Sequence, residues 1–356
     1  MHESVPFHAQ RADDVAWVMP SIRPPGAVAV VTELLRQGVD PKRVLVVDDS
    51  LKGSVVAAVD VHGVLTARTR GRGQGTARNL GAARLDADWI VYVDDDIQLE
   101  DGAVRRLLDV LAGLAPESNV GIVEVAVSAV GQIGPPYWRC RVVEASRPGG
   151  FLTACMAVRR SAFLEIGGVR AKSRGGFRED TDWGIRIMQQ GWRGIWADVG
   201  IRHPVEYVNF WRFLKTAAYF WHDAAFERNH PGYLAKQARR RQIGPVRVGL
   251  LRSRTPPVVA VATALSLTLT FRGRQSRPLA GLVTGLVPLV GGVTLAAAHV
   301  ERLRQVAPVP ASAAVDPREI AAHAVWCLVA GGSRLVGEAA CLPAVLRSKI
   351  GAVGQV

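Results

Sequence analysis

The sequence predicts an α/β fold in which a mostly parallel sheet is followed by a helical, apolar C-terminal region. Two observations support this prediction: short apolar runs that end in polar turns alternate with helical segments, and long apolar segments occupy the C-terminal third. Such alternation is typical of a parallel sheet with helices on both faces. Ligands of these sheets bind beyond the carboxyl ends of the strands. The residues that end each apolar run are therefore the candidates for a functional site.

Each predicted element follows from its residue pattern. Strands are expected where β-forming apolar residues run together up to a polar turn, and helices where apolar residues recur with helical spacing. Gly38 and Gly191 are expected to end two of the helices. In chain order, the expected elements are a strand over 15–21, a helix over 28–37, a strand over 43–50, a helix over 76–84, a strand over 89–97 and a helix over 184–190.

Three consecutive aspartates, Asp94, Asp95 and Asp96, follow the apolar run that begins at Trp89. Hard carboxylate oxygens suit Mg²⁺ or Mn²⁺, and proteins usually hold such a cation with one or two carboxylates plus the phosphates of a substrate. A solvated acidic turn is the alternative, since short motifs also occur without function. The run therefore predicts a metal site at the edge of the sheet, where Asp48 and Asp49 also fall.

Four motifs occur in order between about residues 15 and 230. They are VVDDS at 46–50, GTARNLGA at 75–82, ADWIVYVDDDI at 87–97, and GGFLTACMAVRRSAFLEIGGVR at 149–170 followed by FREDTDWGIRIMQQGW at 177–192. This series resembles the family 2 glycosyltransferases. The resemblance implies the GT-A fold, a Rossmann-like, mostly parallel sheet that binds a nucleotide sugar.

The resemblance also implies which residues bind the nucleotide-sugar donor. Asp48 or Asp49 would contact the nucleoside, and Ser21 and Arg23 would flank the nucleobase. Arg78 is expected to pair with phosphate or with the aspartates, and a salt bridge at the start of a helix is its alternative. The full set implied for the donor is Ser21, Arg23, Asp48, Asp49, Arg78, Asn79, Asp94 and Asp95.

A metal ion and a general base complete the site that the resemblance implies. Asp94 and Asp96 would hold Mn²⁺ or Mg²⁺, with His203 as a further ligand, although a lone histidine is more often structural. A cation there would offset the charge that builds on the leaving phosphate. Asp180 would act as catalytic base by taking the proton of the acceptor hydroxyl. A direct in-line displacement of this kind inverts the anomeric configuration.

The acidic segment around Asp180 has a second interpretation. Glu179, Asp180 and Asp182 precede an amphipathic stretch, and acidic residues at a helix start are favoured by capping and by the helix dipole. Asp182 is expected to be structural rather than the base.

Other motifs are weak or missing. The glycine-rich segment 71–75 lacks the ending of a P-loop, and no GxGxxG follows the first strand, which disfavours a dinucleotide-dependent oxidoreductase. The four cysteines show no CxxC spacing, so neither a zinc site nor a disulfide framework is expected. A Gln-x-x-Arg-Trp motif of processive synthases is also absent, which favours transfer of a single sugar.

Charge and hydropathy divide the chain into three predicted regions: a catalytic domain over 13–230, a basic linker or juxtamembrane segment over 231–254, and a helical apolar region over 255–346. The net charge of +13 indicates acidic partners. Because basic residues precede the apolar run 256–271, an anionic membrane surface is favoured over nucleic acid. The second run, 279–298, has about the length that crosses a bilayer. A membrane hairpin, interfacial helices and a small soluble helical domain remain open.

These features predict a metal-dependent, inverting glycosyltransferase at the cytoplasmic face of the cell membrane, with a lipid-linked or hydrophobic acceptor. A soluble enzyme that tailors a small natural product or peptide in the cytoplasm is one alternative. A catalytically degenerate nucleotide-sugar-binding scaffold is another.

Overall fold

The computed structural model describes residues 14–170, 178–233, 259, 263 and 277–353. The chain forms two compact units: unit 1 takes Met1–Val130 and Val143–Pro204, and unit 2 takes Gly131–Val142 and Val205–Val356. Most of the predicted basic linker 231–254 and of the apolar run 256–271 lies outside the described residues.

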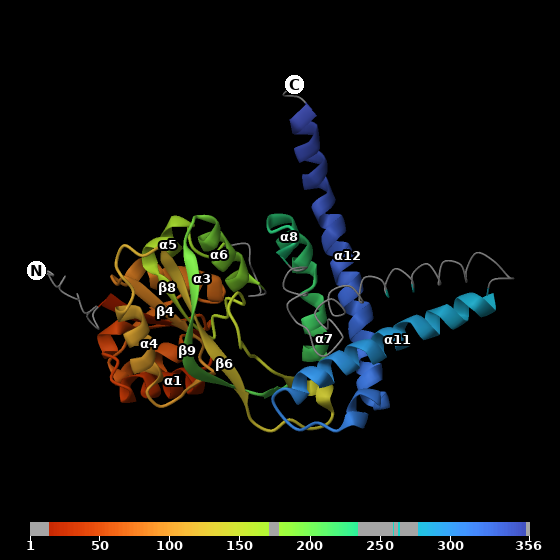
Figure 1. Ribbon diagram of the computed structural model, residues 1–356, viewed down its shortest axis with the longest axis horizontal. Coiled ribbons are helices and arrows are strands. Elements are labelled where there is room, and N and C mark those ends of the chain that lie inside the picture. The colour runs from red at the N-terminus through yellow and green to blue at the C-terminus, as the bar shows by residue number, and fades with distance from the viewer. Residues whose placement is uncertain (1–13, 171–177, 234–258, 260–262, 264–276, 354–356) are drawn as a thin grey trace, which may run out of the picture. The chain divides into compact units, whose positions relative to one another are not determined.

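Unit 1 is built on an eight-stranded mixed sheet with the strand order β3-β2-β1-β4-β8-β6-β9-β5 (Figure 1). The first four strands in this order are parallel, and β8 runs antiparallel to both of its neighbours. The strands are β1 (Val15–Ser21), β2 (Val44–Asp48), β3 (Leu65–Arg68), β4 (Trp89–Val93), β5 (Gln98–Leu99), β6 (Val120–Val130), β8 (Cys155–Arg159) and β9 (Arg193–Pro204).

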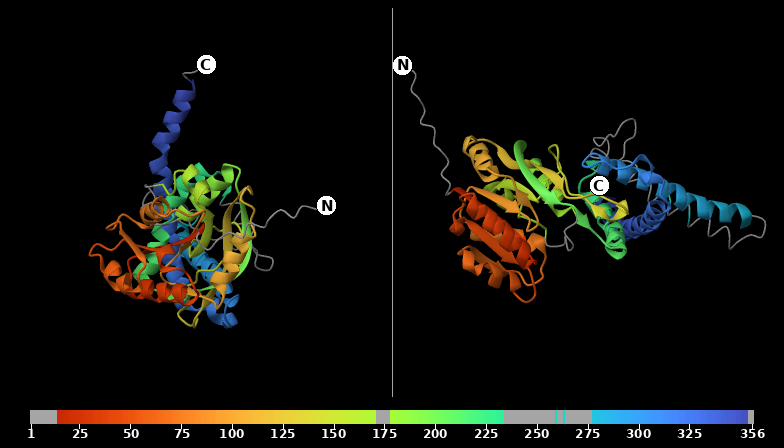
Figure 2. Two further views of the ribbon diagram at one scale, coloured as in Figure 1. Left: turned by 90° about the vertical axis from the view of Figure 1, so that its left-hand side faces the viewer. Right: turned by 90° about the horizontal axis from the view of Figure 1, so that it is seen from below.

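Helices cover both faces of this sheet (Figures 1 and 2). All residues of β1, β2, β4 and β8 are buried, as continuous apolar strands in a two-sided sheet require. The predicted α/β class is therefore confirmed. The helices of unit 1 are α1 (Pro24–Arg36), α2 (Ser54–Val59), α3 (Gln74–Arg84), α4 (Ala103–Ala112), α5 (Arg160–Glu165) and α6 (Glu179–Gln189).

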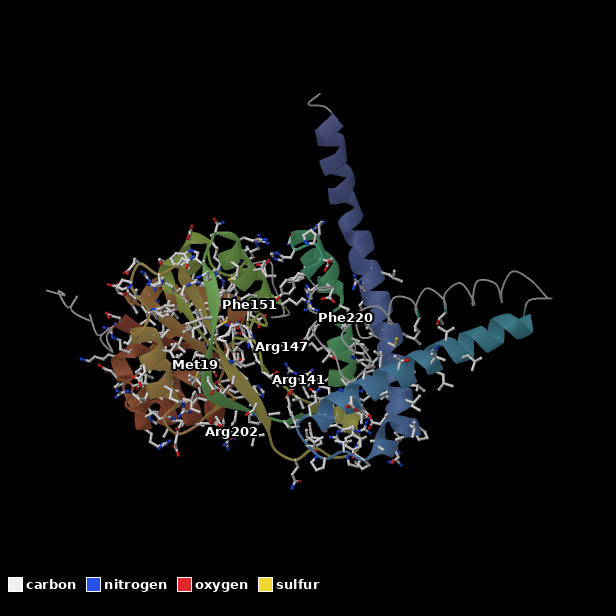
Figure 3. The ribbon with its side chains drawn as sticks, viewed as in Figure 1. Met19, Arg141, Arg147, Phe151, Arg202 and Phe220 are labelled. Atoms are coloured by element: carbon white, nitrogen blue, oxygen red, sulfur yellow. The ribbon has the colours of Figure 1, made fainter. Side chains whose placement is uncertain are left out.

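Side chains that alternate along β1 pack on opposite faces of the sheet. Trp17 and Met19, which is labelled in Figure 3, are fully buried in the core that includes α1 and α4. Val18 faces α3, where a Cβ atom on Gly81 would come within 2.4 Å of its Cγ1. Glycine at position 81 therefore lets α3 lie directly against the sheet.

A cluster of three buried aromatic rings fixes α6 on the same face as α3. Tyr92 of β4, Phe163 of α5 and Trp183 of α6 contact one another, with ring centroids between 5.4 and 6.1 Å apart. Tilted and edge-on ring pairs of this kind are favourable beyond the area that they bury. The cluster ties the helix that begins with Glu179 and Asp180 to the strand that ends in the three aspartates.

Unit 2 is mainly helical. Its core includes Phe213, Phe220 and Trp326, whose rings pack together. The apolar run 279–298 lies within a helix, as predicted for this region. The elements are β7 (Cys140–Arg141), β10 (Glu206–Tyr207), α7 (Phe210–Ala218), α8 (Trp221–Asn229), α11 (Arg277–Arg304) and α12 (Pro317–Val353).

Unit 1 ends before the predicted end of the catalytic domain, and the predicted domain bounds stay a prediction. The sequence places the end of the catalytic domain at residue 230, whereas unit 1 ends at Pro204. The reason is that the apolar sides of α7 and α8 pack against α12, as the contact of Phe220 with Trp326 at 5.2 Å illustrates.

Among the described residues, one helical segment is long and apolar enough to cross a bilayer. It is Leu286–Arg304, which forms part of α11. Core helices of soluble proteins can meet the same criterion. Side chains on this helix are exposed at Leu286, Leu289, Val290 and Val293. Their spacing places them on one side of the helix.

Candidate active site

The strand ends that the sequence singles out lie at one edge of the sheet. β1 is parallel to both β2 and β4, and Ser21 is in register with Asp48. The carboxyl ends of the three strands therefore meet, as expected for a ligand-binding edge. The residues that follow β4 lie at this same edge.

Ser21 and Arg23 both contact the aspartate turn, which we define as Asp94 to Asp96. Ser21 donates from its hydroxyl to Asp95 at 2.5 Å, and the Nε atom of Arg23 donates to the same carboxylate at 3.1 Å. The Nη2 atom of Arg23 lies 2.8 Å from Oδ2 of Asp96. The nucleobase contacts predicted for Ser21 and Arg23 stay predictions.

Asp96 and His203 form the part of the site that best fits a divalent cation. Oδ1 of Asp96 is buried, has no hydrogen-bond partner among the described residues, and lies 3.3 Å from Nε2 of His203. The Nδ1 atom of His203 is 2.9 Å from the carbonyl oxygen of Pro204. Because a carbonyl only accepts, Nδ1 carries a proton, which directs Nε2 toward Asp96. When Nε2 carries no proton, this nitrogen and the carboxylate oxygen that it faces suit a shared cation.

The charges of this pair are coupled. Burial lowers the pKa of His203, but the adjacent Asp96 carboxylate raises it by more, so that the pKa lies above its ordinary value. Burial raises the pKa of Asp96, but contacts to His203 and Arg23 lower it by more. The pKa of that carboxyl therefore lies below its usual range. Asp96 is therefore a carboxylate at neutral pH.

Asp94 has a different environment. Burial raises the pKa of Asp94 to about 6, although Arg78 acts in the opposite direction. Its Oδ1 atom lies 3.3 Å from Nη2 of Arg78. Together, Asp94, Asp96 and His203 offer two carboxylates and an imidazole, a donor set that Mn²⁺ and Mg²⁺ accept. Within the described ranges no three His, Cys, Asp or Glu side chains converge as a complete metal cage. Such a site would need the phosphates of a substrate to complete its coordination.

Arg78 links the aspartate turn to α6. Its side chain is 2% exposed, and its Nη1 atom donates to Oε1 of Glu179 at 2.5 Å. Arg78 also attracts Asp180 electrostatically. Arg78 thus contacts both Asp94 and the acidic start of α6. Its predicted role in binding the donor stays a prediction.

Asp180 lies in the first turn of α6. Its Oδ1 atom accepts from the backbone N–H of Thr181 at 2.7 Å. Burial raises the pKa of Asp180 against the attraction of Arg78. A carboxylate with a raised pKa is a stronger proton acceptor.

The two acidic neighbours of Asp180 are engaged in ion pairs. Asp182 accepts from Arg170 at 3.1 Å and from Arg186 at 2.9 Å, and Glu179 is paired with Arg78. Asp182 thus has the structural surroundings that the sequence predicts. Asp180 is the acid of this segment without an ion pair at hydrogen-bond distance among the described residues.

Asp48 and Asp49 fasten loops at the sheet edge. Asp48 is fully buried and accepts from three backbone N–H groups at 2.7 to 3.0 Å, two of them in the first turn of α2. Asp49 accepts from the hydroxyl of Thr69 at 2.7 Å and from the N–H of Gly73 at 2.9 Å. Both carboxylates are therefore engaged within the protein, and Asp49 is the more exposed of the two, at 9% against 0%. The predicted nucleoside contact stays a prediction.

Asn79 uses its amide on a single partner. It donates to the carbonyl of Val169 at 2.8 Å and accepts from the N–H of the same residue at 2.7 Å. This exchange ties α3 to the residues that follow α5. The predicted contact of Asn79 with the donor stays a prediction.

Glu124 is a buried carboxyl that the sequence does not single out. It accepts from the backbone N–H groups of Gly149, Gly150 and Phe151 at 2.7 to 3.0 Å. Phe151, labelled in Figure 3, packs on α6, where a Cβ on Gly184 would lie 2.4 Å from its ring. Glu124 therefore orders the loop beside Asp180. Its only sequence signal is one acid within an apolar strand.

Part of the chain matches the model of a known protein family. Residues 23–167 match the family model described as Glycosyl transferase family 2. These residues form a family 2 glycosyltransferase domain. The resemblance predicted from the four motifs, and with it the GT-A class, is confirmed.

Two curated relatives are similar to the glycosyltransferase domain. The N-acetylglucosaminyl-diphospho-decaprenol L-rhamnosyltransferase of Mycobacterium tuberculosis is 29% identical over 200 residues, which cover 44% of this chain and 64% of that protein. An uncharacterized glycosyltransferase of Haemophilus influenzae is 25% identical over 204 residues, which cover 54% of this chain and 67% of that protein. The chain thus spans less than two thirds of the length of the rhamnosyltransferase.

Solved structures give weaker likenesses. A glucosyl-3-phosphoglycerate synthase from Mycobacterium tuberculosis, in complex with Mn²⁺, uridine diphosphate and glucosyl-3-phosphoglycerate, has a TM-score of 0.44 at 13% identity, covering 64% of this chain and 85% of that chain. S. aureus TarS 1-349 has a TM-score of 0.39 at 12% identity, covering 90% of both chains.

Proposed function

We propose that this glycosyltransferase uses a divalent cation to transfer a single sugar, with inversion, from a nucleotide-sugar donor to a hydroxyl of a lipid-linked or otherwise hydrophobic acceptor. The observation that supports this most is the arrangement around Arg78. Its guanidinium pairs with Asp94 of the aspartate turn and also attracts Asp180. Candidate metal ligands and a candidate base therefore lie on either side of one buried cation.

In this mechanism Asp94, Asp96 and His203 would hold Mn²⁺ or Mg²⁺, which would bind the donor diphosphate and offset the charge of the leaving group. Asp49 would hold the nucleoside at the ends of β1 and β2. Asp180 would accept the proton of the acceptor hydroxyl, a contribution of about 10²- to 10⁴-fold. Arg78 keeps α6 beside the aspartate turn and so positions Asp180. Attack from the side opposite the leaving group inverts the anomeric centre.

A lipid-linked acceptor is supported by two observations. The relative from Mycobacterium tuberculosis is named for transfer to a decaprenol-linked diphospho-sugar. In addition, α11 exposes apolar side chains along one side, as interfacial helices do. We place the enzyme at the cytoplasmic face of the membrane, where the charge of +13 would favour anionic lipid.

Donor-dependent thermal stabilisation tests the proposal. Full-length protein is heated with UDP-, GDP- and dTDP-sugars, each with and without Mn²⁺. A ligand at about 100 times its dissociation constant adds roughly 2.7 kcal/mol to the free energy of unfolding. One donor class should raise the melting temperature in the presence of Mn²⁺ and much less without it. A melting temperature that no donor changes would count against the proposal.

A further inference from the structure

An open cavity of about 340 Å³ lies between the end of β3 and α3 of unit 1. Four arginines line it: Arg68, Arg70, Arg72 and Arg84. The remaining lining residues are Thr69, Thr76 and Leu80. No acidic side chain of the described part of the chain lines the cavity, so its walls are strongly cationic.

None of the four arginines has an ion-pair partner among the described residues. Several other exposed arginines of unit 1 do have ion-pair partners. Arg36, for example, pairs with Glu33, and Arg105 pairs with Asp109. Like charges within one small cavity repel one another. Four unneutralised guanidinium groups around one cavity therefore indicate a site for an anion.

The cavity wall is held in place by contacts within the protein. The Nη2 atom of Arg68 donates to the carbonyl of Leu51 at 3.1 Å. Its guanidinium covers Gly53, where a Cβ would lie 2.6 Å from Cζ. Glycine at position 53 leaves the space that this guanidinium occupies. Arg68 is therefore ordered before any ligand binds.

The turn that supplies Arg70 and Arg72 has an unusual backbone. Arg70 has a φ of 54°, a left-handed conformation that side chains other than glycine rarely adopt. The N–H of the next residue, Gly71, donates to the backbone carbonyl of Asp49 at 2.8 Å and holds the turn. Strained backbone of this kind is concentrated at ligand-binding sites.

This cavity is distinct from the candidate active site. None of the residues predicted for the donor, the cation or the base lines it. The two regions adjoin along the ends of β2 and β3, where the hydroxyl of Thr69 donates to Asp49 and the N–H of Thr69 donates to the carbonyl of Asp48.

We propose that the cavity binds a phosphate-bearing group. The guanidinium fork matches phosphate oxygens through paired, charge-assisted hydrogen bonds, and four such groups around 340 Å³ suit one or two phosphates. The phosphate has two possible sources: the headgroup of an anionic lipid and a soluble phosphate compound. The inference goes beyond the proposed transfer reaction and does not depend on it.

Isothermal titration with inorganic pyrophosphate tests the site directly. Full-length protein is titrated in the presence of EDTA, so that a metal-bound donor site cannot contribute. The variant Arg70→Gln/Arg72→Gln should bind pyrophosphate at least about tenfold more weakly, because each lost guanidinium removes charge-assisted hydrogen bonds. The matched control Arg105→Gln/Arg106→Gln removes the same charge from α4 and should leave the affinity unchanged. Thermal unfolding checks that both variants are folded.

Sedimentation with vesicles identifies the source of the phosphate. The same proteins are mixed with vesicles of phosphatidylcholine alone or with added phosphatidylglycerol. A loss of binding to the anionic vesicles in the Arg70/Arg72 variant, but not in the control, assigns the site to a lipid headgroup. Pyrophosphate binding that depends on Arg70 and Arg72 without such a vesicle effect assigns it to a soluble phosphate. If the wild-type protein binds neither probe through these arginines, or both double variants lose binding equally, the proposal is overturned.

Discussion

Arg78 and Glu179 form a buried ion pair in which each side chain is only 2% exposed and the Nη1–Oε1 distance is 2.5 Å. The pair joins α3 to the first turn of α6, which also carries Asp180. Removal of one partner would leave the other charge buried without compensation, whereas removal of both would not. The pair therefore matters for the folded state as well as for the geometry of the site.

We predict that Arg78→Met and Glu179→Met each lower the free energy of unfolding by about 3–5 kcal/mol. The double variant Arg78→Met/Glu179→Met should lose less than either single variant. Urea unfolding of the three proteins measures the difference. Additive losses in the double variant would contradict a coupled buried pair.

Two aspartates should separate donor binding from catalysis. Asp96→Asn removes a charged ligand from the proposed cation and should weaken donor binding in the presence of Mn²⁺. Asp180→Asn should leave donor binding nearly intact and slow transfer by at least about 10²-fold. Donor titrations and single-turnover assays measure the two effects, with the exposed Asp109→Asn as control. Near wild-type transfer by Asp180→Asn would assign the base to another residue, with Glu179 next.

Glu319 should make the stability of the protein depend on pH. It is 1% exposed and accepts from the N–H of Trp138 at 2.8 Å. Burial raises its pKa from 4.5 to about 7. Between these two values the folded state binds a proton that the unfolded chain has lost, so stability falls as the pH rises.

Denaturant unfolding at about pH 5 and about pH 8 measures this dependence. The loss should be on the order of 2 kcal/mol. Glu319→Gln should remove most of the change, whereas Glu117→Gln, at an exposed position, should retain it. An identical pH dependence in the Glu319→Gln variant would show that other groups cause it.

Gly81 and Gly332 should respond oppositely to substitution by alanine. A Cβ at Gly81 would lie 2.4 Å from Val18, whereas no neighbouring atom lies within 4 Å of a Cβ at Gly332, within the part of the chain that the structure describes. Gly81→Ala should destabilise the protein by about 1–3 kcal/mol through overpacking. Gly332→Ala should stabilise it by up to about 1 kcal/mol, since alanine is the better helix former. Thermal unfolding distinguishes these effects, and a stabilising Gly81→Ala would refute the close packing of α3 on β1.

Membrane association should depend on the exposed side of α11. Leu289→Asp/Val290→Asp places two charges on it and should reduce co-flotation with anionic vesicles by about tenfold or more. High salt should also weaken the binding of the wild-type protein to these vesicles, because it screens the attraction between the basic chain and the anionic lipid. Leu51→Asp/Val61→Asp, at positions of unit 1 that are 80% and 84% exposed, adds the same two charges and is the matched control. Full-length protein that stays soluble at low and high salt would favour a soluble helical region instead.

The sequence predicts the elements whose pattern is local. β1, β2 and β4 are continuous apolar runs, and Asp94 to Asp96 stand where the last of them ends. Contacts between distant segments were not predictable in this way. The pairing of Arg78 with Glu179 depends on the aromatic cluster that places α6, and the antiparallel insertion of β8 beside β4 depends on the whole topology. Glu124 has no motif around it, so only the folded loop reveals its role.

His203 lies near the end of β9, the last long strand of unit 1, whereas Asp96 follows β4, which comes about one hundred residues earlier in the sequence. The two side chains can face each other only after the sheet has been assembled from β4 through β8 and β6 to β9. The affinity of the proposed cation site would therefore report complete folding, because a partly folded chain that already contains β1 to β4 would present the aspartates without the imidazole. During refolding, metal binding would then be gained late, after the secondary structure has formed.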